Sequence, residues 1–230
     1  MSRPSLLASL AALSLVAAKT VPETTVTAST RACQPPHDTY PFCDTTLSLD
    51  ARVKDLVSRI ADADVAPQLT ARHGGGGSPG PASNISAIGL PEWDWGLNAI
   101  HGVQSSCVLG AADGKTYCAT SFMNPVNYGA TWNRSLFFEL GAIIATETRA
   151  LWLAGAVEAS DWSGRPHIGL DTWSPNINIA RDPRWGRNCE VASEDPLVNG
   201  DFGTQYTLGL QTGEDNRFLK AIVTLKHWDA

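Results

Sequence analysis

The chain has 230 residues, of which 43% are hydrophobic and 17% charged, with a formal net charge of −6. This composition is typical of a globular protein, and the length suits one large domain or two small ones. An acidic chain without a cluster of lysines and arginines is repelled by phosphate backbones and anionic lipids, so we expect neither nucleic acid nor a membrane surface as a partner. The acidic charge of the chain therefore favours a neutral ligand.

The first eighteen residues have the order of a secretory signal peptide. Arg3 supplies a positive charge, residues 6–18 form an apolar run, and small residues precede Lys19. Such a run is too short to span a bilayer, so it predicts cleavage near Ala18 and a secreted, extracellular protein. A buried N-terminal helix is the alternative interpretation. Residues 19–40 form a polar N-terminal segment.

The chain contains five cysteines, which suits an oxidising compartment. Cys33 with Cys43 and Cys107 with Cys118 are plausible local disulfides, although the sequence alone does not fix the connectivity. Cys189 is then either free or paired with a cysteine beyond residue 230. Because no two cysteines form a CxxC pair, we expect no zinc site, and no motif suggests a nucleotide, flavin or metal cofactor. Two N-glycosylation acceptors agree with secretion: Asn84-Ile85-Ser86 and Asn133-Arg134-Ser135.

Hydrophobic periodicity predicts three helices. The first covers residues 49–69. The second covers residues 133–153, with Asn133 as its N-cap, and the third begins at Asp195-Pro196, with Asp195 as the cap and Pro196 in the first turn. The apolar faces are Val53, Leu56, Val57 and Ile60 in the first, Leu136, Leu140, Ile143, Ile144 and Leu151 in the second, and Val198, Phe202 and Tyr206 in the third.

Two apolar segments, residues 172–179 and 221–225, predict strands, and the second reads as a strand buried on both faces. The glycine-rich residues 74–81 predict a loop and not a phosphate cradle, because no Gly-Lys-Ser/Thr follows them. Strands alternating with helices indicate an α/β fold with parallel strands, whose functional groups gather at the carboxyl ends of the strands. Polar residues follow both predicted strands, at residues 181–190 and at 226–227.

Residues 181–190 combine three arginines, two acids and a tryptophan. Arginine presents a planar fork of donors that suits vicinal hydroxyls or holds carboxylates in place. Trp185 offers a flat apolar face of the kind that packs against a sugar ring. A salt-bridged surface turn is the alternative reading of such a loop. Lys226-His227 adds a second set of donors at another strand end.

These residues carry a specific resemblance. Residues 174–187, Ser-Pro-Asn-Ile-Asn-Ile-Ala-Arg-Asp-Pro-Arg-Trp-Gly-Arg, followed by Glu194-Asp195-Pro196, resemble the signature of glycoside hydrolase family 3, in its β-xylosidase/β-glucosidase branch. The similarity extends over about residues 40–230. Further segments resemble the same family: residues 41–43 with 52–59, 95–103, 120–122 with 130–133, and 225–227.

The resemblance implies that residues 41–230 are the N-terminal part of a (β/α)8 TIM-like barrel. It implies an exo-acting, retaining β-glycosidase, a β-xylosidase more than a β-glucosidase, that acts at the non-reducing ends of plant or algal cell-wall glycans. The expected partner is therefore a β-linked xylo- or gluco-oligosaccharide. Arg187, Lys226 and His227 match positions that bind sugar hydroxyls in the family, and Asn98 stands where the family has an acid. Asparagine both donates and accepts hydrogen bonds. We expect His101, from the same segment as Asn98, to be packed and structural.

The resemblance assigns no catalytic residue within this chain. The nucleophile and the acid/base of the family are expected beyond residue 230. Asp161 lies in a context similar to that of the nucleophile, but it precedes the arginine loop and is not assigned that role. Glu190, Glu194 and Asp195 are read as partners of the arginines and as a helix cap.

An incomplete barrel is expected to leave the strand at residues 221–225 as an open apolar edge, which promotes aggregation. We therefore expect this chain alone to be inactive and poorly stable. Two alternatives stay open. The first is a non-catalytic sugar-binding module that retains Trp185, Arg187, Lys226 and His227. The second is a structural or protein-binding α/β domain with a chance motif.

Overall fold

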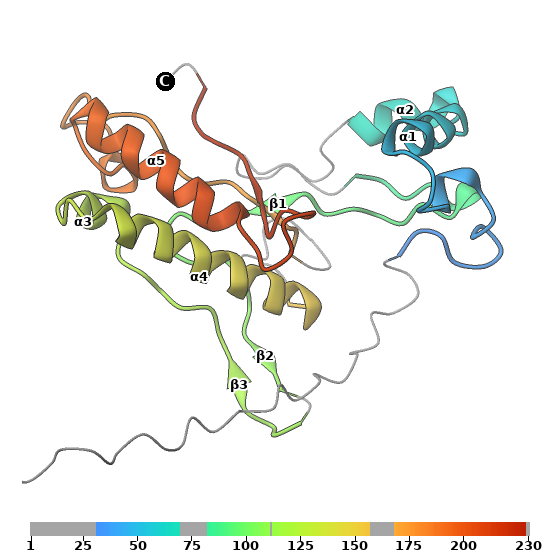
Figure 1. Cartoon of the computed structure of the whole chain (residues 1–230), viewed down its shortest axis with the longest axis horizontal. Coiled ribbons are helices and arrows are strands. Elements are labelled where there is room, and N and C mark those ends of the chain that lie inside the picture. Colours follow the sequence, from blue (N-terminus) through green and yellow to red (C-terminus); the bar gives the residue numbers. More distant parts are fainter. Residues whose placement is uncertain (1–30, 70–81, 111, 157–167, 229–230) are drawn as a thin grey trace, which may run out of the picture.

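The computed structural model describes residues 31–69, 82–110, 112–156 and 168–228 (Figure 1). Within these ranges, a three-stranded sheet has the order β1-β4-β5, with β1 at Gly96–Leu97, β4 at Asp171–Thr172 and β5 at Ile222–Val223. Both pairings are parallel, which confirms the predicted strand direction. The expected signal peptide, the glycine-rich loop and Asp161 lie outside the described residues.

Two long helices pack against this sheet and against each other. They are α4, Arg134–Leu153, and α5, Pro196–Gln211, which lie side by side in Figure 1. Glycines permit this close approach. A Cβ on Gly141 would lie 2.3 Å from the carbonyl oxygen of Tyr206, and a Cβ on Gly209 would lie 2.1 Å from the carbonyl oxygen of Phe138.

The predicted caps of both helices are confirmed. The Asn133 side chain accepts a hydrogen bond from the N–H of Leu136 (3.2 Å), and Asp195 accepts hydrogen bonds from Leu197 (2.7 Å) and Val198 (3.1 Å). Each cap satisfies backbone donors that have no partner within the helix. These short-range bonds explain why the starts of both helices could be read from the sequence.

The hydrophobic core lies between the two helices and the sheet. Phe202 is fully buried, and its ring meets Phe137 edge-on, with ring centroids 5.4 Å apart, and Tyr206 at 5.2 Å. The Tyr206 hydroxyl donates to the carbonyl of Ala99 at 2.8 Å, which fixes the chain just after β1 to α5. Ile143, predicted on the buried face of α4, is exposed. The other core residues include Leu97, Tyr128, Leu140, Ile144, Ala145, Leu151, Ile168, Leu210 and Ala221.

The prediction of one helix over residues 49–69 is wrong. The structure has two helices, α1 at Leu49–Ser58 and α2 at Asp62–Leu69. Arg59 ends the first by donating its N–H to the carbonyls of Leu56 and Val57, and two aspartates in the first turn of α2 favour a new helix N-terminus there. The predicted apolar face is largely exposed, with Val53 at 48% and Val57 at 60% of their surface accessible.

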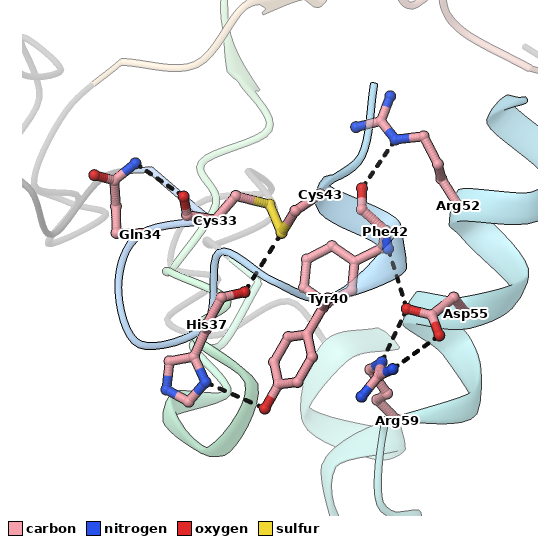
Figure 2. The surroundings of a disulfide bond; sticks show 9 residues. All are labelled: Cys33, Gln34, His37, Tyr40, Phe42, Cys43, Arg52, Asp55 and Arg59. Carbon is pink, nitrogen blue, oxygen red and sulfur yellow. Dashed lines mark hydrogen bonds and ion pairs between the residues drawn. A yellow bond between two sulfur atoms is a disulfide. The ribbon is translucent and has the colours of Figure 1, made fainter. Parts of the chain in front are cut away.

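The segment before α1 is tied down by a disulfide between Cys33 and Cys43 (Figure 2). Asp55 on α1 accepts a hydrogen bond from the N–H of Phe42 (3.1 Å) and forms an ion pair with Arg59 (2.9 Å). The disulfide closes this segment on itself, and the Asp55 carboxylate holds its end against the helix. The shorter helices are η2 Pro41–Cys43, η3 Ser86–Ile88, α3 Pro125–Gly129 and η4 Asn188–Glu190.

A two-stranded antiparallel hairpin, which the sequence did not suggest, projects away from α5 in Figure 1. It pairs β2, Val108–Leu109, with β3, Thr116–Tyr117. The second expected disulfide, Cys107–Cys118, closes its base. Both local disulfides are therefore confirmed, and Cys189 is free and exposed.

The predicted strands are shorter and less buried than expected. The strand predicted at residues 172–179 ends at Thr172, because Pro175 has no N–H for the ladder, and a single bridge between Asn176 and Lys226 follows. The prediction that residues 221–225 are buried on both faces is wrong. Ile222 is 41% and Leu225 50% exposed, because β5 lies at the edge of the sheet in the described part of the chain. Among the described residues, no helix is both long and apolar enough to cross a bilayer.

Candidate functional site

Four side chains predicted from the sequence meet at the carboxyl ends of the strands. Asn98 follows β1, Arg187 lies in the loop after β4, and Lys226 and His227 follow β5. The Lys226 Nζ donates to Asn98 Oδ1 at 3.0 Å, and Arg187 Nη1 lies 2.9 Å from His227 Nε2. Parallel strands deliver their carboxyl ends to one edge of the sheet, so residues up to 128 positions apart become neighbours. We call these four residues the polar cluster.

Asn178 positions His227 and was missed as a site residue. Its Oδ1 accepts from the His227 backbone N–H (3.0 Å) and lies 3.3 Å from His227 Nδ1, while its Nδ2 donates to the His227 carbonyl (3.2 Å). Because an arginine only donates, Nε2 of His227 accepts from Arg187, and its Nδ1 carries the proton toward Asn178. Asn178 lies inside the Ser174–Arg187 motif, which was the available signal.

The arginines of residues 181–190 have different roles. Arg187 forms a two-pronged ion pair with Glu190, with Nε 3.0 Å from Oε1 and Nη2 bonded to Oε2. Arg184 pairs with Asp182 at 2.7 Å, but its side chain is 90% exposed. The expectation that Glu190 partners an arginine is confirmed. Glu194, expected to act in the same way, forms no ion pair within the described part of the chain.

Arg181, the third of these arginines, contacts the ring of Trp185. The guanidinium of Arg181 lies 4.1 Å from the centroid of the Trp185 ring, a cation–π contact. The expected sugar-stacking face of Trp185 is therefore partly occupied by Arg181, and Trp185 does not line the cleft described below. The structure does not bring Trp185 into the polar cluster.

Burial and like charges shift the pKa values in the polar cluster. Burial, with the nearby Arg187 charge, lowers the pKa of Lys226 to about 8. Burial also lowers the pKa of His227, and the charges of Arg187 and Lys226 add to this effect, so His227 is neutral near pH 7. Burial alone would raise the pKa of Glu190, but the hydrogen bonds and charge of Arg187 outweigh it and lower that pKa.

A cleft of about 460 Å³ opens beside the polar cluster. Asn98, Arg187 and Glu190 line one part of it, and the remaining lining comes from residues 100–105 and 118–121, at the base of the disulfide-linked hairpin. His101 lines the cleft and is exposed, so the expectation that it is packed and structural is wrong. Its carbonyl accepts from the N–H of Phe122 at 2.8 Å, so the backbone is fixed while the imidazole is free to face the cleft.

Trp173 is a second site-adjacent residue that the sequence reasoning did not single out. Its backbone N–H donates to Leu97 at 3.0 Å, which places it directly after β4 and opposite Asn98. Asp171, on β4, accepts hydrogen bonds from Thr224 (2.8 Å) and from Trp173; burial raises its pKa, and these two hydrogen bonds oppose the shift. The available signal was an aromatic residue near the start of the strand predicted at residues 172–179. The described residues contain no group of three or more His, Cys, Asp or Glu side chains that could hold a metal ion.

No protein-family model matches the chain, but known proteins do. It is 38% identical over 193 residues to beta-xylosidase/alpha-L-arabinofuranosidase 2 of Medicago sativa subsp. varia, and 36% identical over 193 residues to an exo-1,4-beta-xylosidase of Emericella nidulans. The matches cover 83% and 84% of this chain. A solved GH3 exo-beta-xylosidase (XlnD), in complex with a xylobiose aziridine activity-based probe, superposes with a TM-score of 0.67 at 31% identity over 87% of this chain.

The chain belongs to glycoside hydrolase family 3. It spans about a fifth of the length of the relatives it matches, at 22% of the two xylosidases and 23% of the solved structure. Beta-glucosidase 3B from Thermotoga neapolitana, at 22% identity and a TM-score of 0.54, shares the fold. The described sheet and helices are accordingly part of a TIM-like barrel, as the sequence predicted.

Proposed function

We propose that this chain is the sugar-binding N-terminal part of an exo-acting, retaining β-glycosidase, a β-xylosidase more than a β-glucosidase. Its substrates would be β-linked oligosaccharides at the non-reducing ends of plant or algal cell-wall glycans. The observation that carries the proposal is the polar cluster, in which Asn98, Arg187, Lys226 and His227 converge from three strand ends beside a cleft.

The chemistry of the cluster suits a neutral sugar. Arg187 and Lys226 donate hydrogen bonds, while the amide of Asn98 both donates and accepts, so together they match hydroxyl groups, which also do both. Within the polar cluster, Arg187 is neutralised by Glu190, whereas Lys226 forms no ion pair with a carboxylate among the described residues. A hydroxyl bound to such half-buried donors is held more strongly than one in water.

The preference for xylose rests on the relatives. One curated relative is named an exo-1,4-beta-xylosidase and the other a beta-xylosidase/alpha-L-arabinofuranosidase, and the solved relative at 31% identity is in complex with a xylobiose-derived probe. The similarity to glucosidases is weaker, at 22% identity, and supports the fold only.

We further propose that the catalytic carboxyls lie outside this segment. Retaining hydrolysis needs two carboxyls about 5–5.5 Å apart, one as nucleophile and one as acid/base. Glu190, the carboxylate at the polar cluster, is instead held by both prongs of Arg187. A non-catalytic sugar-binding module is the second candidate, and the observation that favours it is that the four residues proposed to bind hydroxyls all lie in this one segment.

We also propose that the protein is secreted after removal of residues 1–18. Two disulfides support an oxidising compartment. Asn84 is exposed, as a glycosylation acceptor must be. Asn133 is exposed too, and the cap it forms uses its Oδ1 and leaves Nδ2 for a glycan.

The test is calorimetric binding of xylose, glucose and arabinose to the chain, with hydrolysis of an aryl β-xyloside measured in parallel. We expect xylose binding that Arg187→Ala abolishes and Arg184→Ala leaves unchanged, since Arg184 is exposed and pairs only with Asp182. The glycosidase proposal is supported if the chain binds xylose without hydrolysing the xyloside and the product of a longer transcript does hydrolyse it. A transcript that ends at codon 230 supports the sugar-binding module instead. If Arg187→Ala, Arg184→Ala and the parent chain all bind xylose with equal affinity, the assignment of Arg187 to the binding site is wrong.

A further inference from the structure

We infer that Asn199, on α5, is a positioning residue: its side-chain amide holds together the two ends of the arginine loop, residues 181–190, and so sets where Arg187 and His227 lie. Asn199 lies outside the polar cluster and does not line the cleft beside it. The inference rests on the proposed function only where it concerns sugar binding by the polar cluster, and the hydrogen bonds that carry it are independent of that function.

The Asn199 amide joins three backbone groups from two segments. Its Nδ2 donates to the carbonyls of Ile177 (2.9 Å) and Asn178 (2.6 Å), and its Oδ1 accepts from the N–H of Ala192 (3.2 Å). Ile177 and Asn178 precede the arginine loop, and Ala192 follows it. One side chain therefore uses both of its donor protons and its acceptor to bridge the two ends of the loop.

The bridge is buried and is built on a rigid element. Asn199 is only 2% exposed, and its own N–H donates to the Asp195 carbonyl at 3.0 Å in the first turn of α5. It lies between the buried apolar residues Val198 and Phe202. Asparagine is a weak helix former, and burial of its amide is costly unless the amide is hydrogen-bonded. The three hydrogen bonds to the loop ends therefore account for an asparagine at this core position.

The arginine loop is tied to the rest of the protein at its base. Inside the loop, Arg184 pairs with Asp182, which shapes the loop without fixing its position on the sheet. At the base, the N–H of Ala180 donates to the carbonyl of Ser193 at 3.2 Å, next to the bridge made by the amide. A change at the base should therefore move the whole loop, and Arg187 with it.

The same amide reaches His227 through Asn178. The carbonyl of Asn178 accepts from Asn199, while its side chain bonds to the N–H, the Nδ1 and the carbonyl of His227. These bonds keep the imidazole proton on Nδ1 and leave Nε2 to accept from Arg187 at 2.9 Å. Asn199 thus holds both partners of the Arg187–His227 contact, one from each end of the loop.

The test is Asn199→Asp, which keeps the shape of the side chain, removes both donors and turns a carboxylate toward two carbonyl oxygens. Calorimetry measures xylose affinity at pH 7, and NMR of the chain labelled on its histidine nitrogens measures the tautomer of His227, with His227→Gln to assign the signal. We expect the proton on Nδ1 in the parent and both tautomers in the variant. Xylose affinity should fall about tenfold, the effect of one lost hydrogen bond to a charged donor.

Gly209→Ala is the matched control for stability. Gly209 lies on the same helix, but a Cβ there would press on the Phe138 carbonyl of α4 and not on the arginine loop. This variant should melt at a lower temperature and keep both the His227 tautomer and the xylose affinity of the parent. Asn199→Thr is a milder second variant, which carries the test if Asn199→Asp does not fold. Its hydroxyl can donate to one of the two carbonyls, so we expect intermediate changes in tautomer and affinity.

The outcomes separate positioning from stability and from the proposed function. An unchanged His227 tautomer in a folded Asn199 variant overturns the inference, because Asn199 would then act on stability alone. The same tautomer change in Gly209→Ala also overturns it. A changed tautomer with unchanged xylose affinity overturns it for Arg187. If the parent binds no xylose but Asn199→Asp still changes the tautomer, the proposed function fails and the positioning role of Asn199 stands.

Discussion

Arg187 and His227 are forty positions apart, yet Nη1 of the arginine lies 2.9 Å from Nε2 of the histidine. The same guanidinium holds both oxygens of Glu190. One planar side chain therefore orients a carboxylate and an imidazole at once, which a lysine cannot do because its ammonium is a single point of charge.

Arg187→Lys should therefore weaken xylose binding despite keeping the charge. The expected loss is roughly 1.5–3 kcal/mol, the range for a hydrogen bond to a charged group. Calorimetry at pH 7 measures it, with Arg184→Lys as the control, because Arg184 is an exposed residue that pairs only with its near neighbour Asp182. If Arg187→Lys binds xylose within twofold of the parent's affinity, the planar guanidinium is not needed for binding.

The pH dependence of binding should follow Lys226. Its pKa of about 8 means that the ammonium loses its proton as pH rises through about 8, so xylose affinity should fall there. Asn98→Asp places a carboxylate where Oδ1 now lies 3.0 Å from Lys226 Nζ, which favours the charged form and raises the pKa of Lys226. The fall in affinity should then move to higher pH. If the pH at which xylose affinity falls is the same in the variant and the parent, the fall is not caused by Lys226.

The same shift predicts how stability changes with pH. Between about 8 and the ordinary lysine value of 10.5, the unfolded chain carries a proton on Lys226 that the folded chain has lost. Stability rises with pH wherever the unfolded state binds more protons, so this lysine should make the free energy of unfolding increase across that interval. Lys226→Met, which cannot titrate, should lose that increase in urea unfolding measured at pH 8 and pH 10.

The glycines of α5 provide a stability test. Gly209→Ala should destabilise the protein, because its Cβ would lie 2.1 Å from the Phe138 carbonyl of α4 and force the helices apart, at a cost of about 1–3 kcal/mol. Gly200→Ala is the matched control on the same helix, since a Cβ there meets nothing within 4 Å. It should stabilise by about 0.5–1 kcal/mol through helix propensity. Thermal unfolding compares the two, and similar melting temperatures would refute the close packing.

Two buried tyrosines offer a matched pair. The Tyr206 hydroxyl donates to Ala99 at 2.8 Å, whereas the Tyr128 hydroxyl is buried without a hydrogen-bond partner among the described residues. Tyr206→Phe should cost about 1 kcal/mol and leave the Ala99 carbonyl unpaired, while Tyr128→Phe should be neutral or stabilising. Chemical denaturation of both variants measures the difference. A larger loss in Tyr128→Phe would mean that the hydroxyl has a partner.

The sequence by itself indicated the features whose interactions are local, although it left the pairing of the cysteines open. The caps at Asn133 and Asp195 act on residues two or three positions away, and the two disulfides join cysteines ten and eleven positions apart. The parallel α/β class followed from alternating strands and helices, and the motif at residues 174–187 indicated the family. Such features are readable because the partners lie within one short stretch of chain.

Only the tertiary structure decided which distant residues become partners. It joined Asn98 to Lys226 across 128 positions, and it gave three similar arginines three different partners. It also exposed His101, because the turn at Gly102 is fixed by a neighbour, Thr120, that the local sequence does not reveal. Where long-range hydrogen bonds and close packing hold the backbone, the local sequence pattern does not indicate which residue is the partner. Only the folded structure shows it.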